Sequence, residues 1–308
     1  MPTREARVSL HVVLFVEAGD PHGLSAVDAT VLGPGDAVPE GERFDLAVAT
    51  GAGSVARLGE VAGEPPRALL LMDMEDRALP AGSAAAEAAA AVFTLPLPAI
   101  VPARWMAAQL EQLRAAPVHV VHPGIDRTVF APPATVVRGD DGAPLRVLVL
   151  GGPATGLDEA LAAAAAMREP VTVARLDPDT APPAERAAAY AAADVVLALP
   201  RIAGLPRGPL EAFHLGATCV MTAVTGHDEY VVDGANGLVT SWDDERGTSR
   251  LLDLLARDRE LLHRLRAAAL DTARAWPDLA AGAALLDEAL RATATAIATD
   301  QPPREAHA

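Results

Sequence analysis

The sequence predicts an α/β protein built from two doubly wound units that face each other across a cleft. Short apolar runs rich in β-branched residues alternate with stretches that favour helices, which is typical of parallel sheets covered by helices on both faces. One segment interrupts this alternation, FAPPATVVRGDDGAPL (residues 130–145), and a new strand begins directly after it. Its Pro, Gly and Asp content is typical of a domain boundary. We therefore expect one domain over residues 1–138 and another over residues 139–308.

The predicted elements follow one another in a regular order. The strands are expected at residues 10–16, 44–50, 67–73, 118–121, 145–151, 170–176, 194–199 and 216–223. The helices are expected at residues 53–60, 82–92, 103–115, 157–167, 183–192 and 208–215, with further helices over 246–276 and 279–297. In such folds ligands bind at the carboxyl ends of the strands, so we expect the site in the cleft between the two units.

The composition excludes several classes of function. The chain has 308 residues, of which 51% are hydrophobic and only 3% aromatic, so the core must consist of Ala, Val and Leu. A formal net charge of −16 argues against non-specific binding of nucleic acid, which needs basic patches. The single cysteine, Cys219, is expected as a small buried hydrophobe in a cytoplasmic protein. The apolar run VSLHVVLFV is too short to cross a bilayer, and no transmembrane segment is expected.

Two glycine-rich turns follow predicted strands. GAGSVA (residues 51–56) fits the G-x-G-x-x-A form of a dinucleotide-binding loop, and Asp73 closes the next strand at a suitable distance. An NAD-dependent enzyme is therefore one alternative, and a plain strand-to-helix turn is the other. GGPATG (residues 151–156) lacks the Lys-Ser/Thr pair of a P-loop. His119 and His122 lie on a predicted strand and point to opposite faces, so no metal site is expected.

The segment LALPRIAGLPRGPLEAFHLGA (residues 197–217) carries the most information about a site. A strand ends at Pro200, and Pro209 suits the first turn of the helix that follows. Glu211 is predicted in that first turn, where the helix dipole favours a carboxylate or a bound anion. Gly216 is predicted to end the helix. Glu211 is either a ligand-binding carboxylate or only a partner of the helix dipole.

Residues 190–244, which begin YAAADVVLALPRIAGLPRGPLEAF and end VVDGANGLVTSWDD, resemble the donor-binding segment of retaining glycosyltransferases of family four. These enzymes have the GT-B fold, two Rossmann-like domains facing each other across a cleft, and their C-terminal helix returns to the first domain. VHPGIDRTVFAP (residues 121–132) resembles an element at the end of their first domain. Three upstream segments, FDLAVATGAGSVARL, RALLLMDMEDRALPAGS and PARWMAAQL, are similar to the rhamnan-synthesis branch, which includes rhamnosyltransferases.

The resemblance implies a site for the nucleotide sugar in the second domain. In the family two carboxylates separated by seven residues flank the donor, and the second, which binds the ribose, matches Glu211. The first falls at Ala203, and the family's two basic residues fall in GGPATG, which has none. Two arginines, Arg201 and Arg207, stand in the loop before the Glu211 helix. We expect one of them, with Arg207 preferred over Arg201, to replace the missing positive charge beside the diphosphate.

The resemblance also implies roles for other residues. Gly204, Leu205, Gly226 and His227 are expected to shape the phosphate end of the donor pocket, while Asp73 and Glu75 of the first domain are candidates for contacting the acceptor. The implied reaction is metal-independent transfer of a sugar, with retention, from a nucleotide-diphosphate sugar to a hydroxyl of a carbohydrate or lipid-linked acceptor, in polysaccharide or glycoconjugate synthesis. No further cofactor is implied. The alternative is a non-catalytic homologue that binds a sugar nucleotide or a partner protein.

Overall fold

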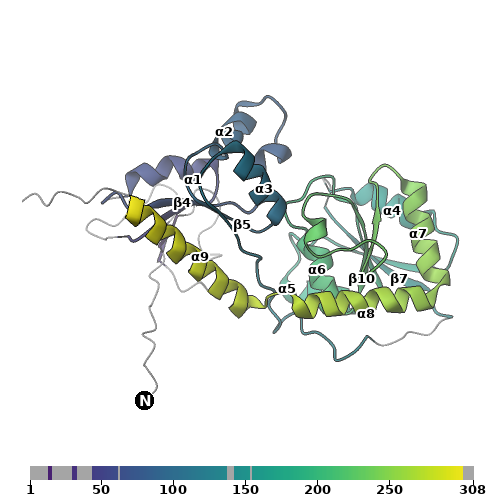
Figure 1. The fold of residues 1–308 in the computed structure, drawn as a ribbon. Helices are drawn as coiled ribbons and strands as arrows, with labels where there is room; N and C mark the ends of the chain where they lie inside the picture. Colours follow the sequence, from purple (N-terminus) through teal and green to yellow (C-terminus); the bar gives the residue numbers. More distant parts are fainter. Residues whose placement is uncertain are drawn as a thin grey trace, which may run out of the picture.

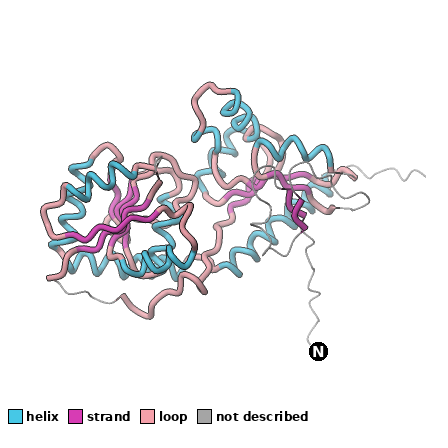
Figure 2. The backbone as a smooth tube through the Cα atoms, turned by 180° about the vertical axis from the view of Figure 1, so that it is seen from behind, coloured by secondary structure: helices cyan, strands magenta, loops and turns pink. Residues whose placement is uncertain are grey.

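Two lobes, each with a parallel sheet between helices, make up the protein (Figures 1 and 2). The structure is a computed structural model, and it describes residues 13–15, 30–32, 44–61, 63–136, 142–152 and 155–300. The predicted α/β class with two Rossmann-like domains is confirmed. Because residues 137–141 lie outside the described part, the limits 1–138 and 139–308 remain a prediction.

The first lobe has a four-stranded parallel sheet of order β3-β4-β5-β6, beside a separate parallel pair of β1 and β2. Its strands are β1 (Val13–Phe15), β2 (Thr30–Leu32), β3 (Ala47–Ala49), β4 (Arg67–Leu70), β5 (Ala99–Val101) and β6 (Val118–Val120). Its helices are α1 (Ala52–Arg57), α2 (Ala84–Val92), α3 (Arg104–Leu113) and the 3₁₀ turns η2 (Leu58–Glu60) and η3 (Glu75–Ala78). Ala, Leu and Met side chains of these elements form its core.

The second lobe has a five-stranded parallel sheet of order β11-β10-β9-β7-β8. Its strands are β7 (Leu145–Leu150), β8 (Val171–Leu176), β9 (Val195–Ala198), β10 (Thr218–Thr222) and β11 (Leu238–Thr240). Its helices are α4 (Leu157–Ala165), α5 (Pro183–Ala192), α6 (Arg207–His214), α7 (Glu245–Arg257), α8 (Arg259–Ala275) and the 3₁₀ turn η4 (His227–Glu229). Two hydrophobic clusters fill the space on its two faces, one beneath α4 and α7 and one beneath α5 and α6.

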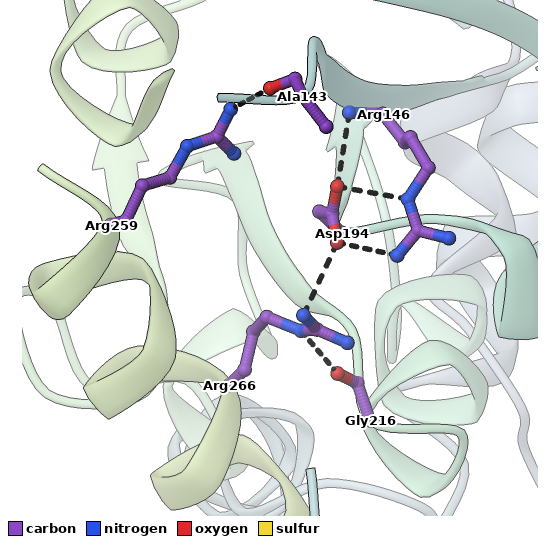
Figure 3. Close-up of polar contacts among 6 residues, drawn as sticks. All are labelled: Ala143, Arg146, Asp194, Gly216, Arg259 and Arg266. Carbon is purple, nitrogen blue, oxygen red and sulfur yellow. Dashed lines mark hydrogen bonds and ion pairs between the residues drawn. The ribbon is translucent and has the colours of Figure 1, made fainter. Parts of the chain in front are cut away.

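An ion-pair network around the buried Asp194 holds the second sheet to helix α8 (Figure 3). Asp194, at the start of β9, accepts hydrogen bonds from Arg146 of β7 at 2.6 and 3.0 Å and forms an ion pair with Arg266 of α8 at 3.2 Å. Arg266 also donates to the Gly216 carbonyl at 2.7 Å, in the turn before β10. Burial would raise the pKa of Asp194, but the two arginines outweigh it and hold this pKa below its usual range.

Two segments join the lobes and lie side by side. The first follows β6 and the second follows α8, and they meet in an isolated parallel bridge between Ile125 and Asp278. The Trp276 indole donates to the Pro123 carbonyl at 3.0 Å, and Arg127 donates to the Trp276 carbonyl at 2.7 Å. The connection between the lobes is therefore a double strand of chain held by backbone and side-chain hydrogen bonds.

Helix α9 (Leu279–Asp300) leaves this connection and runs back beside the first lobe (Figures 1 and 2). Two of its residues, Ala289 and Thr293, are buried, with exposed fractions of 7% and 1%. A helix that starts in the predicted second domain therefore covers part of the first, which is the arrangement that the resemblance implied.

The structure also contains strands that the sequence pattern did not predict. β2, β5 and β11 are each three residues long, too short to show a clear alternation. β8 was predicted correctly, but it is not covered on both faces as expected of a parallel strand, because residues 172–175 are exposed at the edge of the sheet. Cys219 is fully buried as predicted, and burial raises the pKa of its thiol.

Candidate functional site

A cavity of about 530 Å³ opens where the carboxyl ends of the second domain's strands face the first domain. This volume suits a small organic ligand. The residues that line it are Leu150 at the end of β7, Gly151 and Thr155 after β7, Pro178 and Asp179 after β8, Arg186 on α5, Ala198 at the end of β9 and Pro200 after it, residues 203–209, Glu211 on α6, and Asp73 after β4. Five residues predicted for the site, Asp73, Gly204, Leu205, Arg207 and Glu211, therefore lie together around one cavity.

Glu211 is the buried carboxylate of this cavity. Only 3% of the residue is exposed, and both carboxylate oxygens accept from Arg186, at 3.1 and 3.4 Å. Arg207 lies 3.7 Å from the same carboxylate. Burial raises the pKa of Glu211, while the two arginines oppose that rise. A carboxylate has about four acceptor positions, and the two hydrogen bonds from Arg186 do not fill them all.

The position of Glu211 on its helix differs from the prediction. Helix α6 begins at Arg207, so no acidic residue lies in its first turn and Glu211 belongs to the second. Pro209 is the third helical residue, which is tolerated because the first N–H groups of a helix have no partner within it. The predicted helix end is confirmed: the Gly216 N–H bonds to Phe213, and Gly216 has a positive φ of 81°.

Three arginines near the site have different surroundings. Arg207 lines the cavity with half of its side chain exposed. Arg201 does not line it: this side chain pairs with Glu159 at 2.5 Å and stacks over the Trp242 ring at 4.4 Å. Arg186, on α5, lines the cavity and is mostly buried. Sequence reasoning missed Arg186 because nothing local to α5 connects it with a carboxylate on another helix.

The side chains that line the cavity carry slightly more negative than positive formal charge. Among its described residues there are three carboxylates, Asp73, Asp179 and Glu211, and two arginines, Arg186 and Arg207. Both arginines already interact with Glu211. An anionic ligand at the phosphate end would therefore depend on these arginines and on the N–H groups at the start of α6.

The remaining predicted residues, Glu75, Gly226 and His227, do not line the cavity. Gly226 packs against the cavity loop, since a Cβ there would lie 2.1 Å from the Gly204 carbonyl oxygen. His227 begins the turn η4, and its ring bonds to the Val224 carbonyl at 2.5 Å. Glu75 starts η3 and is not among the lining residues. Of the two acceptor-side candidates, the structure places Asp73 at the cavity.

The GAGSVA turn does not line this cavity, and two N–H groups at its start are already hydrogen-bonded within the turn. The Ser54 hydroxyl accepts from the N–H groups of Thr50 and Gly51, at 2.8 and 3.0 Å. The Glu75 carboxylate faces the turn, because a Cβ on Gly51 would lie 2.7 Å from its oxygen. A pyrophosphate would be repelled by this carboxylate, so the NAD alternative is not favoured.

The described part of the chain contains no group of three or more His, Cys, Asp or Glu side chains arranged to hold a metal ion. None of its helices is both long and apolar enough to cross a membrane.

Comparison with known proteins shows what the second domain and the whole fold resemble. Residues 145–272 match the family described as "Glycosyl transferases group 1". Similar solved structures include sucrose-phosphate synthase from Thermosynechococcus elongatus (16% identity, TM-score 0.68, covering 82% of this chain and 74% of that one). They also include HepE from Anabaena in complex with UDP-glucose (15% identity, TM-score 0.69, covering 93% and 91%). No curated protein sequence matches the chain.

These results agree with the geometry. Residues 145–272 are similar to group 1 glycosyltransferases, and the chain has the two-domain GT-B fold. The family match lies within the second domain, which supplies every described lining residue of the cavity except Asp73. HepE was also solved in complex with UDP and glucose.

Proposed function

We propose that this protein is a retaining glycosyltransferase that transfers a sugar from a nucleotide-diphosphate sugar to an acceptor hydroxyl, in polysaccharide or glycoconjugate synthesis. The observation that carries the proposal is Glu211, a buried carboxylate in a cavity at the carboxyl ends of the second domain's strands. In this position it accepts hydrogen bonds from the two ribose hydroxyls. The family match over residues 145–272 supports the donor class.

The proposed roles follow the lining of the cavity. The loop with Gly204 and Leu205 surrounds the phosphates, and Gly226 and His227 support it from behind. Arg207 and the N–H groups at the start of α6 stabilise the negative charge that develops on the leaving diphosphate. The sugar–phosphate bond breaks, the acceptor oxygen bonds to the same carbon on the same face, and its proton passes to a diphosphate oxygen. No metal ion takes part.

The acceptor binds on the side of the first domain. Asp73 is the residue proposed to contact it, because this carboxylate lines the cavity from β4 and accepts hydrogen bonds from sugar hydroxyls. The acceptor is a carbohydrate or a lipid-linked sugar. Membership of the rhamnan-synthesis branch is part of the same proposal and rests on the upstream sequence segments.

The test has a binding arm and a turnover arm. In thermal unfolding, UDP, GDP and dTDP are compared with NAD, and we expect one nucleoside diphosphate to raise the midpoint by several degrees at one hundred times its Kd. UDP comes first because HepE was solved with UDP and with UDP-glucose. The purified chain is then given the matching sugar nucleotides and scored for transfer or hydrolysis. Binding without turnover over the whole panel would instead indicate a non-catalytic sugar-nucleotide-binding protein, and Ala203 would be a reason for it.

A further inference from the structure

Glu229 connects the two domains at a point that the proposed reaction does not use. It ends the turn η4 of the second domain, and only 3% of its side chain is exposed. One oxygen accepts from the Arg104 N–H at 2.6 Å. The other lies 2.9 Å from His122 Nε2 and 3.1 Å from the Arg104 guanidinium. All these partners belong to the first domain or to the segment that directly follows β6.

The contact with the Arg104 N–H has a specific cause. Arg104 is the first residue of α3, and the residue before it, Ala103, has no side-chain group that can cap the helix. The first N–H groups of a helix need acceptors from outside it. Glu229 supplies one from the other domain, where the helix dipole also favours its charge. Helix α3 is therefore capped across the domain interface.

A second contact joins the same helix to the wall of the cavity. The Trp105 indole, next to Arg104, donates to the Gly204 carbonyl at 2.7 Å. Gly204 in turn lies against the first domain, since a Cβ there would be 2.9 Å from Asp73 and from the Met72 carbonyl oxygen. The start of α3 thus holds the cavity loop against Asp73.

The turn that carries Glu229 is itself fastened to the cavity loop. The Thr225 hydroxyl donates to the Ala203 carbonyl at 2.8 Å, and the Tyr230 hydroxyl donates to the Pro206 carbonyl. The turn with Glu229 and residues 203–206, which line the cavity, are therefore held together and move as one unit relative to the first domain.

We propose that Glu229 is a positioning residue that keeps the cleft closed and so holds the donor loop against Asp73 of the first domain. With Glu229 on the start of α3, the domains are closed and Asp73 lies at the Gly204 loop. Without it, α3 loses its cap, a charged contact is lost, and the domains separate. The acceptor side then moves away from the donor side, while the donor pocket, built almost wholly from the second domain, remains. This inference rests on the proposed function for its kinetic consequence but not for the closure itself.

The experiment compares Glu229→Gln with Asp228→Asn. Gln keeps the length of Glu229 but removes its charge and one of its two acceptor oxygens. Asp228 precedes it in the same turn and is exposed, so Asp228→Asn removes a charge of the same sign without touching the interface. Trp105→Phe is an independent variant, which removes the indole N–H donor and keeps an aromatic ring. Thermal unfolding first shows which variants fold.

Closure is measured by small-angle X-ray scattering, which reports the separation of the lobes without any need for activity. We expect Glu229→Gln and Trp105→Phe to increase the radius of gyration, and Asp228→Asn to match the wild type. With a donor and an acceptor that the wild type uses, kcat of Glu229→Gln should be roughly 10–100-fold below that of the wild type, as expected when reacting groups are displaced by about 1 Å. Kd for the nucleoside diphosphate should stay within about threefold, since the donor pocket is intact.

The outcomes separate the two proposals. If the wild type transfers no sugar, the proposed function fails, but the scattering result still decides the role of Glu229. If Glu229→Gln is folded and its scattering profile and kcat equal those of Asp228→Asn, the positioning role is wrong. If Glu229→Gln does not fold, Trp105→Phe with an unchanged profile and unchanged kcat overturns the proposal.

Discussion

At the scale of single residues, the site depends on one buried carboxylate and its arginine. The Arg186 guanidinium binds both oxygens of Glu211. Removal of either partner of such a pair is strongly destabilising, because the other charge is left buried without a partner. The arginine therefore fixes the carboxylate in one orientation and keeps part of its acceptor capacity directed at the cavity. This preorganisation is what a diol-binding group requires.

The substitution Glu211→Gln should weaken binding of the nucleoside diphosphate by about 1–3 kcal/mol, because a charged acceptor of the ribose hydroxyls becomes a neutral amide. Titration calorimetry measures the change. Glu185→Gln is the matched control, since Glu185 is exposed one residue before Arg186 on the same helix. Equal affinity in Glu211→Gln and the control would show that Glu211 is only a structural partner of Arg186.

The two arginines of the loop before α6 should differ in their effects. Arg207→Ala removes a cation that lines the cavity, and we expect transfer to fall by roughly 10–100-fold, since loss of one group that stabilises developing charge costs about this much or more. Arg201→Ala should retain wild-type transfer, because Arg201 is directed at Glu159 and Trp242. Turnover assays with the same donor measure both. Full transfer in Arg207→Ala would contradict the role given to it.

At the scale of elements, Asp194 fixes the start of β9 between β7 and α8 (Figure 3). Asp194→Asn should lower the free energy of unfolding at pH 7 by about 2–4 kcal/mol. This is near the lower end for a broken buried pair, because Arg146 is half exposed. Urea denaturation measures the loss, and Asp243→Asn, at an exposed position of the same domain, is a suitable control.

The same carboxylate predicts a pH dependence. The pKa of Asp194 is lower in the folded protein than in the unfolded chain, where it is about 3.9. The native state therefore binds fewer protons there, and its stabilising contribution is complete above about pH 4 and is lost as the pH falls through the folded value. The stability difference between wild type and Asp194→Asn should shrink on acidification below about pH 4. A difference that stays constant from pH 7 to pH 3 would contradict this assignment.

The sequence predicts elements well where one segment contains the signal. Apolar runs such as residues 145–151 and 216–223 predict β7 and β10 within one or two residues. The pattern fails for β5, which follows two prolines and has only three residues. It also misplaces Glu211 in the first turn of α6, because the helix begins at Arg207, one residue before the predicted start at residue 208, and Glu211 falls in the second turn.

Contacts between distant segments could not be predicted from such patterns. The Glu211 position was found through the resemblance, but its partner Arg186 comes from another helix, 25 residues away. Glu229 and Arg104 are 125 residues apart, and their contact exists only when the two domains meet. Local periodicity contains no information on such pairs, so the cavity's residues were partly predictable and its supporting contacts were not.

At the scale of the whole molecule, the chain passes between the lobes along two adjacent segments, and a pair of glycines lets them touch. Gly124 follows β6 and Gly282 lies in the first turn of α9. A Cβ on Gly282 would lie 2.6 Å from the Gly124 nitrogen and 2.9 Å from its Cα. A Cβ on Gly124 would lie 2.2 Å from the Asp278 carbonyl oxygen. The direction in which α9 returns to the first lobe therefore depends on backbone-to-backbone contact at this crossing.

This contact reverses the usual effect of a helical Gly→Ala substitution. In an ordinary helix the change stabilises by about 0.5–1 kcal/mol, because glycine loses more backbone entropy on folding. Gly282→Ala should instead lower the free energy of unfolding by about 1–3 kcal/mol, since the added methyl group meets backbone atoms that cannot move aside and α9 must shift away. Gly59→Ala is the matched control: it lies in the short helix η2 and its added Cβ would meet nothing within 4 Å. Urea denaturation should show a loss for Gly282→Ala and no loss for Gly59→Ala, and the displaced α9 should also increase the radius of gyration in scattering. A gain in stability for Gly282→Ala equal to that of a normal helical site would mean that a methyl group fits between Gly282 and Gly124, and that this close contact does not hold α9 to the first lobe.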